Sequence, residues 1–253
     1  MQHSFYGEMY SEGYDKGEGR YDMQSFYLER WNRLGKPIPV LEPMCGTGFF
    51  LAAFLDAGAD IDGLDASPYM LRKCQDKVKG GKAAVNLYQQ RLEDLSLPRK
   101  YNFIYIPDRS FAQFDDRETA QVGLGKLWDC LLPGGWFVLD VRPPPPEGEF
   151  GKPGETSFGV QDRPDGSVVF RTTLWSKKDE GRVIRSVNKF EVFQNGSHMT
   201  TELFDYHERF YERDEFGEML RSAGFTDIQV TKAYEDAEPA EYDCMVFSCR
   251  KPV

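Results

Sequence analysis

Short apolar runs alternate with amphipathic stretches over the first 142 residues of the chain. The apolar runs predict strands over residues 40–42, 60–64, 85–89, 101–106 and 137–141. The stretches beside them have helical periodicity and predict helices over residues 22–34, 49–57, 67–77 and 117–131. Strands that alternate with helices in this way indicate an α/β domain with a parallel sheet.

The pattern changes at Arg142. A polyproline run, Pro143 to Pro146, and a Gly/Pro-rich stretch over residues 147–155 read as a linker. Beyond it, alternating stretches predict four antiparallel strands, because residues 164–166, 179–181 and 195–197 between them are hairpin signals. The four strands are expected over residues 157–161, 168–175, 183–194 and 199–211. We interpret them as a second lobe inserted into the α/β domain.

The chain then returns to the α/β pattern. A helix is predicted after Asp214 and ends at Gly224, because glycine readily adopts the left-handed backbone conformation that ends many helices. Two strands, over residues 226–233 and 242–251, close the chain and are joined by a short acidic loop. That loop is too short for a helical crossover, so the two strands must pair antiparallel.

Composition narrows the class of protein. The chain of 253 residues carries a net charge of −10 and has no densely basic stretch, which disfavours a nucleic-acid substrate. No apolar run approaches the roughly 20 residues that span a bilayer, and residues 1–5 lack the features of a secretory signal. The five cysteines are scattered, without metal-ligand spacing. We therefore expect a cytoplasmic protein without a metal site that acts on a small molecule, and a homodimer stays open.

The candidate chemistry lies at the ends of the first two strands. Gly46 and Gly48 form a turn in which the backbone can approach a ligand, and Asp65 ends the second strand. A dinucleotide fingerprint needs a third glycine, but Leu51 occupies that position. Glu42 stands beside the turn instead, and its carboxylate suits a cationic ligand better than a pyrophosphate.

This segment resembles motif I of the class I S-adenosylmethionine-dependent methyltransferases, E/D-x-x-x-G-x-G. The Pro-Gly-Gly turn at residues 133–135 and the closing antiparallel pair are similar to the same family. The resemblance implies a Rossmann-like seven-stranded sheet with an antiparallel last strand, and S-adenosylmethionine as cofactor. It places Glu42 near the amino-acid end of the cofactor and Asp65 on its ribose hydroxyls.

The resemblance also implies a set of cofactor-binding residues. They are Tyr21, Glu42, Gly46, Gly48, Asp65, Ala66, Met70, Leu92, Glu93 and Pro107. Arg91 departs from the family pattern, because the family usually has an acid there that accepts from the adenine amino group. Glu93 is the substitute acceptor, and the backbone of Leu92 can donate to the adenine ring.

The inserted strands and the tyrosine-rich segment 7–21 resemble the small-molecule branch of the family. That branch includes sugar N,N-dimethyltransferases and glycine N-methyltransferase-like enzymes. The implied units are an N-terminal segment with a helix (1–35), a cofactor-binding domain (36–142 and 212–253) and a lobe over the acceptor (143–211). The groups expected near the acceptor are Tyr14, Tyr21, Asp108, Arg109, Tyr206 and His207. Among these, Tyr14, Tyr21, Arg109 and His207 are the predicted catalytic residues.

The function expected from this reading is methyl transfer from S-adenosylmethionine to nitrogen or oxygen of a small polar acceptor. Such a displacement depends mainly on holding the acceptor and the methyl group in line, although a hydroxyl acceptor can need a general base. Two alternatives stay open: a non-catalytic cofactor-binding module, and a methyltransferase of protein or RNA. A nucleotide-dependent oxidoreductase ranks last, because the closing antiparallel pair is untypical of NAD-binding folds.

Overall fold

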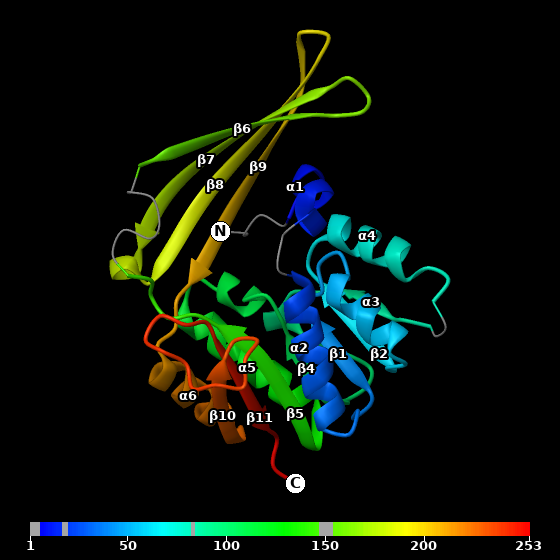
Figure 1. Cartoon of the computed structure of the whole chain (residues 1–253), viewed down its shortest axis with the longest axis vertical. Coiled ribbons are helices and arrows are strands. Elements are labelled where there is room, and N and C mark those ends of the chain that lie inside the picture. The colour runs from blue at the N-terminus through cyan, green and yellow to red at the C-terminus, as the bar shows by residue number, and fades with distance from the viewer. Residues whose placement is uncertain (1–5, 17–19, 82–83, 147–153) are drawn as a thin grey trace.

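A computed structural model describes residues 6–16, 20–81, 84–146 and 154–253. The chain forms a seven-stranded sheet covered by helices, and a separate four-stranded antiparallel sheet that projects from one end of this body (Figure 1). The fold class predicted from the sequence is therefore confirmed.

The larger sheet has the strand order β10-β11-β5-β4-β1-β2-β3. Its strands are β1 Val40–Pro43, β2 Ile61–Asp65, β3 Leu87–Gln89, β4 Tyr101–Ile106, β5 Leu131–Val141, β10 Thr226–Lys232 and β11 Met245–Arg250. Strands β1 to β5 pair in parallel, whereas β11 runs antiparallel to both of its neighbours, β5 and β10. The reversal of the last strand, which the short acidic loop predicted, is confirmed.

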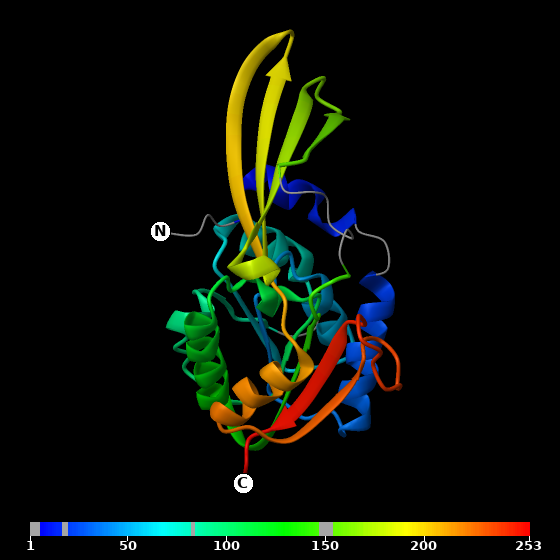
Figure 2. The ribbon, with the colours of Figure 1, turned by 90° about the vertical axis from the view of Figure 1, so that its left-hand side faces the viewer.

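Helices cover both faces of this sheet (Figure 2). One face packs against α2 Arg20–Arg33, α3 Phe49–Asp56 and α4 Pro68–Val78, and the other against α5 Arg117–Cys130 and α6 Arg213–Ser222. Strand β4 shows why both faces must be covered: Phe103 and Tyr105 join one apolar cluster, whereas Ile104 and Ile106 join the other. Its continuous apolar sequence is thus what a central parallel strand requires.

The four-stranded sheet is the inserted lobe. Its strands are β6 Thr156–Asp162, β7 Val168–Lys178, β8 Val183–Gln194 and β9 Ser197–Arg209, each antiparallel to the next. Val169, Phe190 and Val192 form a small apolar cluster on the face that receives Met9 and Tyr10. Part of the predicted linker, residues 147–153, lies outside the described residues.

The N-terminal segment lies between the lobe and the seven-stranded sheet. It contains α1 Glu8–Gly13 followed by the 3-10 turn Tyr14–Lys16. The Glu202 carboxylate on β9 accepts hydrogen bonds from the backbone N–H groups of Met9 (3.1 Å) and Tyr10 (3.4 Å). The Ser67 hydroxyl donates to the backbone oxygen of Tyr6 at 2.6 Å. The segment is therefore attached to both sheets.

Most predicted boundaries differ from the observed ones by a few residues. Strand β5 is the exception: it begins at Leu131, so the Pro-Gly-Gly turn is part of the strand as the structure defines it. Ser67 is the N-cap predicted for α4, because its Oγ accepts the Met70 N–H at 3.2 Å. The domain boundaries given above stay predictions.

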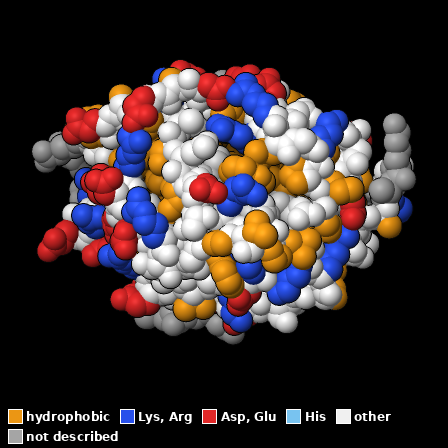
Figure 3. All heavy atoms as spheres, turned by 90° about the horizontal axis from the view of Figure 1, so that it is seen from below, with side chains coloured by type: hydrophobic (Ala, Val, Ile, Leu, Met, Phe, Trp, Pro, Cys, Tyr) orange, Lys and Arg blue, Asp and Glu red, His pale blue; other side chains and the backbone are white. Residues whose placement is uncertain are grey.

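Charged side chains of both signs lie together on the end of the molecule away from the lobe, as far as the described residues show (Figure 3). Figure 3 shows acidic, basic and apolar side chains interspersed on this face. Among the described helices, none is long and apolar enough to cross a membrane.

Gly48 joins β1 to α3 under a tight steric constraint. Its φ is +76°, and a Cβ there would lie 2.5 Å from the Cys74 Sγ on α4. Gly58 has a φ of +89° and nothing within 4 Å of the same hypothetical atom. Gly58→Ala is thus a matched control that carries the left-handed strain without the clash.

We expect Gly48→Ala to lower the free energy of unfolding by about 1–3 kcal/mol more than Gly58→Ala does. Only the first substitution forces a methyl group against the Cys74 side chain on α4. The strain shared by both substitutions is about 1 kcal/mol. Urea denaturation of the two variants and the wild type measures the difference. Equal losses in both variants would show that contact with Cys74 does not restrict this position.

Candidate functional site

The turns after β1 and β2 are held together by the carboxylate of Asp65. Its Oδ2 accepts the Gly46 N–H at 2.9 Å, and its Oδ1 accepts the Ser67 N–H at 2.8 Å. The residue is only 7% exposed. Burial raises the pKa of Asp65 to about 6, although hydrogen bonds from the backbone N–H groups oppose the rise. Each oxygen still has a lone pair available for a ligand hydroxyl.

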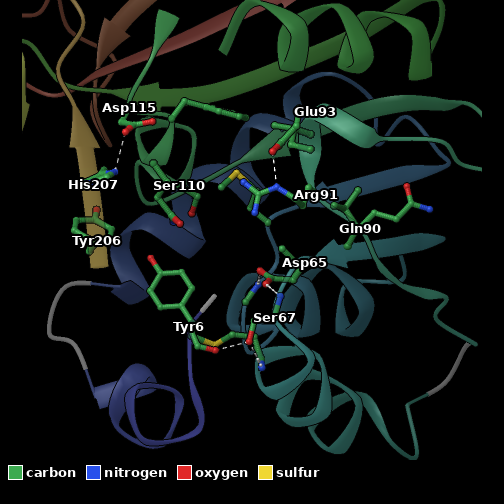
Figure 4. A pocket seen from close by; sticks show the side chains of 18 of the residues that line it. Tyr6, Asp65, Ser67, Gln90, Arg91, Glu93, Ser110, Asp115, Tyr206 and His207 are labelled. Carbon is green, nitrogen blue, oxygen red and sulfur yellow. Dashed lines mark hydrogen bonds and ion pairs between the residues drawn. The ribbon is translucent and has the colours of Figure 1, made fainter. Parts of the chain in front are cut away.

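A cavity of about 410 Å³ lies over these turns (Figure 4). Its walls come from the ends of β2 and β3, the loop before α5, the N-terminal segment and β9. Five carboxylates line it, against a single arginine, Arg91. The carboxylates are Asp65, Glu93, Asp115, Asp116 and Asp205. This excess of negative charge favours a cationic ligand.

Six of the predicted cofactor-binding residues line the cavity. They are Gly46, Asp65, Ala66, Met70, Leu92 and Glu93. Met44, Ser110 and Phe114, which the sequence analysis did not select, also line it. No signal in the sequence sets these three apart from other loop residues.

The other predicted cofactor-binding residues lie outside the lining of this cavity. Glu42 is buried and accepts a hydrogen bond from the Tyr105 hydroxyl at 2.6 Å. Gly48 packs against α4, as described above. Pro107 accepts the Ser110 N–H at 3.2 Å, and Tyr21 is 71% exposed with its ring against Phe49.

Arg91, the residue that departs from the family pattern, forms an ion pair with Glu93. Its Nε donates to the Glu93 Oε1 at 2.5 Å. The pair explains how an arginine is accommodated in a cavity rich in carboxylates. It also holds in place the Glu93 carboxylate, which the sequence predicts as the substitute acceptor for the adenine amino group.

A second cavity, of about 720 Å³, lies between α1, the lobe and the loop after β4. The two cavities share the side chains of Tyr6, Tyr14, Gln113 and Tyr206, which therefore form their common boundary. Tyr14 also lies close to the glycine turn: a Cβ added at Gly46 would lie 3.6 Å from the Cε1 atom of the Tyr14 ring.

The loop after β4 presents Asp108 and Arg109 to the second cavity. The backbone of both residues adopts the left-handed conformation, with φ of +57° at Asp108 and +55° at Arg109. The carboxylate of Asp140, at the end of β5, accepts the Arg109 N–H at 2.9 Å and the Tyr27 hydroxyl at 2.5 Å. Burial raises the pKa of Asp140 to about 6. Sequence reasoning missed Asp140 because it reads as one polar residue inside an apolar strand.

His207 lines the first cavity and is absent from the lining of the second. Its Nδ1 lies 3.1 Å from the Asp115 Oδ2. Its Nε2 lies 3.3 Å from the Lys178 Nζ and 3.4 Å from the Asp205 Oδ1. The histidine therefore connects the lobe to the loop before α5. Its predicted catalytic role, like those of Tyr14, Tyr21 and Arg109, stays a prediction.

Comparison with known proteins finds a likeness for the segment that supplies most of the lining of the first cavity. Residues 40–135 match the family model of a methyltransferase domain. A putative methyltransferase of Geobacillus sp. (strain WCH70) is 22% identical over 257 residues, which cover 96% of this chain and 98% of the relative.

Two solved structures share the fold over nearly the whole chain. An S-adenosylmethionine-dependent methyltransferase from Clostridium acetobutylicum has a TM-score of 0.76 at 15% identity, covering 97% of each chain. The sugar N-methyltransferase KedS8 from Streptoalloteichus sp. has a TM-score of 0.72 at 19% identity, covering 100% of this chain and 95% of its own. The resemblance to class I methyltransferases is thus confirmed for the fold and for the domain over residues 40–135, and S-adenosylmethionine is the cofactor named for the Clostridium structure.

We expect Asp65→Ala to weaken binding of S-adenosylhomocysteine, the demethylated cofactor, at least tenfold, because it removes the charged acceptor that the resemblance places on the ribose hydroxyls. Isothermal titration calorimetry measures the change. Asp140→Asn is the control: this carboxylate is also buried but lies outside the lining of the first cavity. Equal weakening in both variants would assign the effect to general loosening of the fold.

The raised pKa of Asp65 predicts opposite effects of pH on binding and on stability. Cofactor affinity should fall as the pH drops below about 6, because protonation removes the charge of the carboxylate. Between its ordinary pKa of 3.8 and about 6, the folded state binds more protons at Asp65 than the unfolded state does. The contribution of Asp65 to the free energy of unfolding therefore decreases as the pH rises through this window.

Calorimetry and urea denaturation at pH 5 and pH 7.5 test both effects, with Asp65→Asn as the control that cannot titrate. A pH dependence of cofactor affinity that persists unchanged in Asp65→Asn would assign the titration to another group.

Proposed function

We propose that the protein transfers the methyl group of S-adenosylmethionine to a nitrogen or oxygen of a small polar acceptor bound in the second cavity. The observation that carries this proposal is the common boundary of the two cavities, formed by Tyr6, Tyr14, Gln113 and Tyr206. A cofactor seated on Asp65 and an acceptor under the lobe would meet at these side chains. The volume of about 720 Å³ is in the range of a small-molecule site.

The bound cofactor would supply an electrophilic methyl group on a sulfonium. The residues of this chain would contribute position: Asp65 would take the ribose hydroxyls, and the carboxylates of the first cavity would favour the cationic cofactor. The tyrosines at the boundary would exclude water and orient the acceptor. Holding the two partners in line accounts for most of the acceleration available to such a displacement.

Two of the boundary tyrosines, Tyr6 and Tyr206, are poor general bases. Burial raises the pKa of both Tyr6 and Tyr206 well above the ordinary value for tyrosine, so both hydroxyls stay protonated at neutral pH. A hydroxyl acceptor would need a base here, whereas an amine that arrives deprotonated would not. The fold likeness to a sugar N-methyltransferase supports an amino-bearing acceptor, which these two tyrosines could orient without taking a proton.

The proposal predicts two separable steps, cofactor binding and methyl transfer. We expect S-adenosylmethionine and S-adenosylhomocysteine to bind in calorimetry, and labelled methyl groups to reach at least one member of a panel of amino sugars and small amines. We expect the double variant Tyr14→Phe, Tyr206→Phe to transfer methyl groups ~10- to 100-fold more slowly, because the acceptor is held less well.

The affinity for S-adenosylhomocysteine separates this effect from misfolding and should change little in the double variant. Absence of cofactor binding by the wild type would overturn the proposal. Cofactor binding without transfer to any amine or hydroxyl compound would instead favour a non-catalytic cofactor-binding module.

A further inference from the structure

The second cavity contains an arginine whose charge is not balanced by a carboxylate. Within the described part of the chain, no Asp or Glu oxygen lies within 4.0 Å of the Arg171 guanidinium. Each of the other four arginines of the lobe forms an ion pair. The pairs are Arg163–Glu12, Arg182–Glu215, Arg185–Asp205 and Arg209–Asp179. Arg171 is therefore the exception among the lobe arginines.

A buried amide holds the Arg171 guanidinium in place. Asn188 is 2% exposed, and its Oδ1 accepts the Arg171 Nε at 3.2 Å and Nη2 at 2.8 Å. The same oxygen accepts the Thr173 hydroxyl at 2.8 Å, and the Asn188 Nδ2 donates to the Ser186 Oγ at 3.2 Å. The guanidinium also lies 5.7 Å from the centre of the Phe190 ring. Thus Arg171 is positioned by neutral groups that leave its charge intact.

This arrangement uses only part of the donor capacity of the arginine. A guanidinium has five N–H groups, and the two bonds to Asn188 use two of them. Its remaining donors form the planar fork that matches a carboxylate or a phosphate. Arg171 lines the second cavity, so a ligand in that cavity can reach this fork.

The two cavities differ in the sign of their charged side chains. The cofactor cavity has five carboxylates against one arginine. The second cavity has three arginines, Arg109, Arg163 and Arg171, against the two carboxylates of Glu12 and Asp108. Arg163 pairs with Glu12 and Arg109 with Asp108, so the excess is the single positive charge of Arg171, which would attract an anion.

We propose that the acceptor carries an anionic group, a phosphate or a carboxylate, which Arg171 binds while the atom to be methylated lies at the tyrosine boundary. This inference rests on the proposed function and narrows its substrate class. The cofactor cavity selects a cation and the second cavity selects an anion, so the two ligands would not compete for one site.

Three amino sugars that share one ring test the inference: glucosamine, glucosamine 6-phosphate and muramic acid, which carries a carboxylate. Each is titrated into the protein loaded with S-adenosylhomocysteine. We expect at least one of the two anionic sugars to bind about tenfold or more tightly than glucosamine, since charge-assisted hydrogen bonds to a guanidinium are strong. The comparison of glucosamine 6-phosphate with muramic acid separates phosphate from carboxylate recognition.

Two variants assign the preference to Arg171. Arg171→Gln should abolish it, because the positive charge is lost. Asn188→Asp should also reduce it, because a carboxylate of nearly the same shape would neutralise a guanidinium that stays in place. Arg182→Gln is the matched control, because Arg182 is on the same lobe but pairs with Glu215 and lies outside the cavity lining.

Equal affinity for the three sugars, no binding of any of them, or a preference that survives in Arg171→Gln would each overturn the inference. Binding of S-adenosylhomocysteine is measured separately in every variant and should stay at the wild-type level. Failure of that binding in the wild type would reject the proposed function itself. The anion preference would then still be measured on the protein without cofactor, as the rise in its unfolding temperature when each of the three sugars is added.

Discussion

The position of the site depends on the buried carboxylate of Asp65, which is shared between two turns. Because β1 and β2 are parallel neighbours, their carboxyl ends meet, and one acid can accept N–H groups from both following turns. Burial of the charge is unfavourable, as its raised pKa shows. The two backbone N–H groups offset part of that cost and fix the floor of the cavity. Ser67, held by the same acid, caps α4 and binds the N-terminal segment, so the constraint extends from the sheet to the roof of the site.

Much of the fold could be predicted because local patterns determine it. The apolar run of β4, the Ser67 cap and the shortness of the last loop each depend on neighbouring residues in the sequence. The place of Asp65 in the lining of the first cavity was also predictable, since its position at the end of a strand after a glycine turn is a local signal. The contacts of Glu42 with Tyr105 and of Gly48 with Cys74 were not predictable, because these partners approach only in the folded chain.

Residues that line or support the two cavities show the same limit. The ring of Tyr6 packs at a tilt against that of Phe204, with centroids 4.6 Å apart, although almost 200 residues separate the two in sequence. Asp140 on β5 accepts a hydrogen bond from the backbone N–H of Arg109, which lies 31 residues earlier in the loop after β4. Asn188 orients Arg171 across a strand pair of the lobe. None of these partners has a sequence signal of its own, because each acts through a contact that only tertiary structure creates.

The attachment of the N-terminal segment to both sheets has a consequence for how the two sites communicate. Glu202 anchors the segment to the lobe and Ser67 anchors it to the cofactor turn, while Tyr6 and Tyr14 face both cavities. A ligand that orders these tyrosines from one side prepares them for a ligand on the other. Thermodynamic linkage requires the resulting change in affinity to be reciprocal. Occupancy of either cavity would therefore raise the affinity of the other for its own ligand by the same factor.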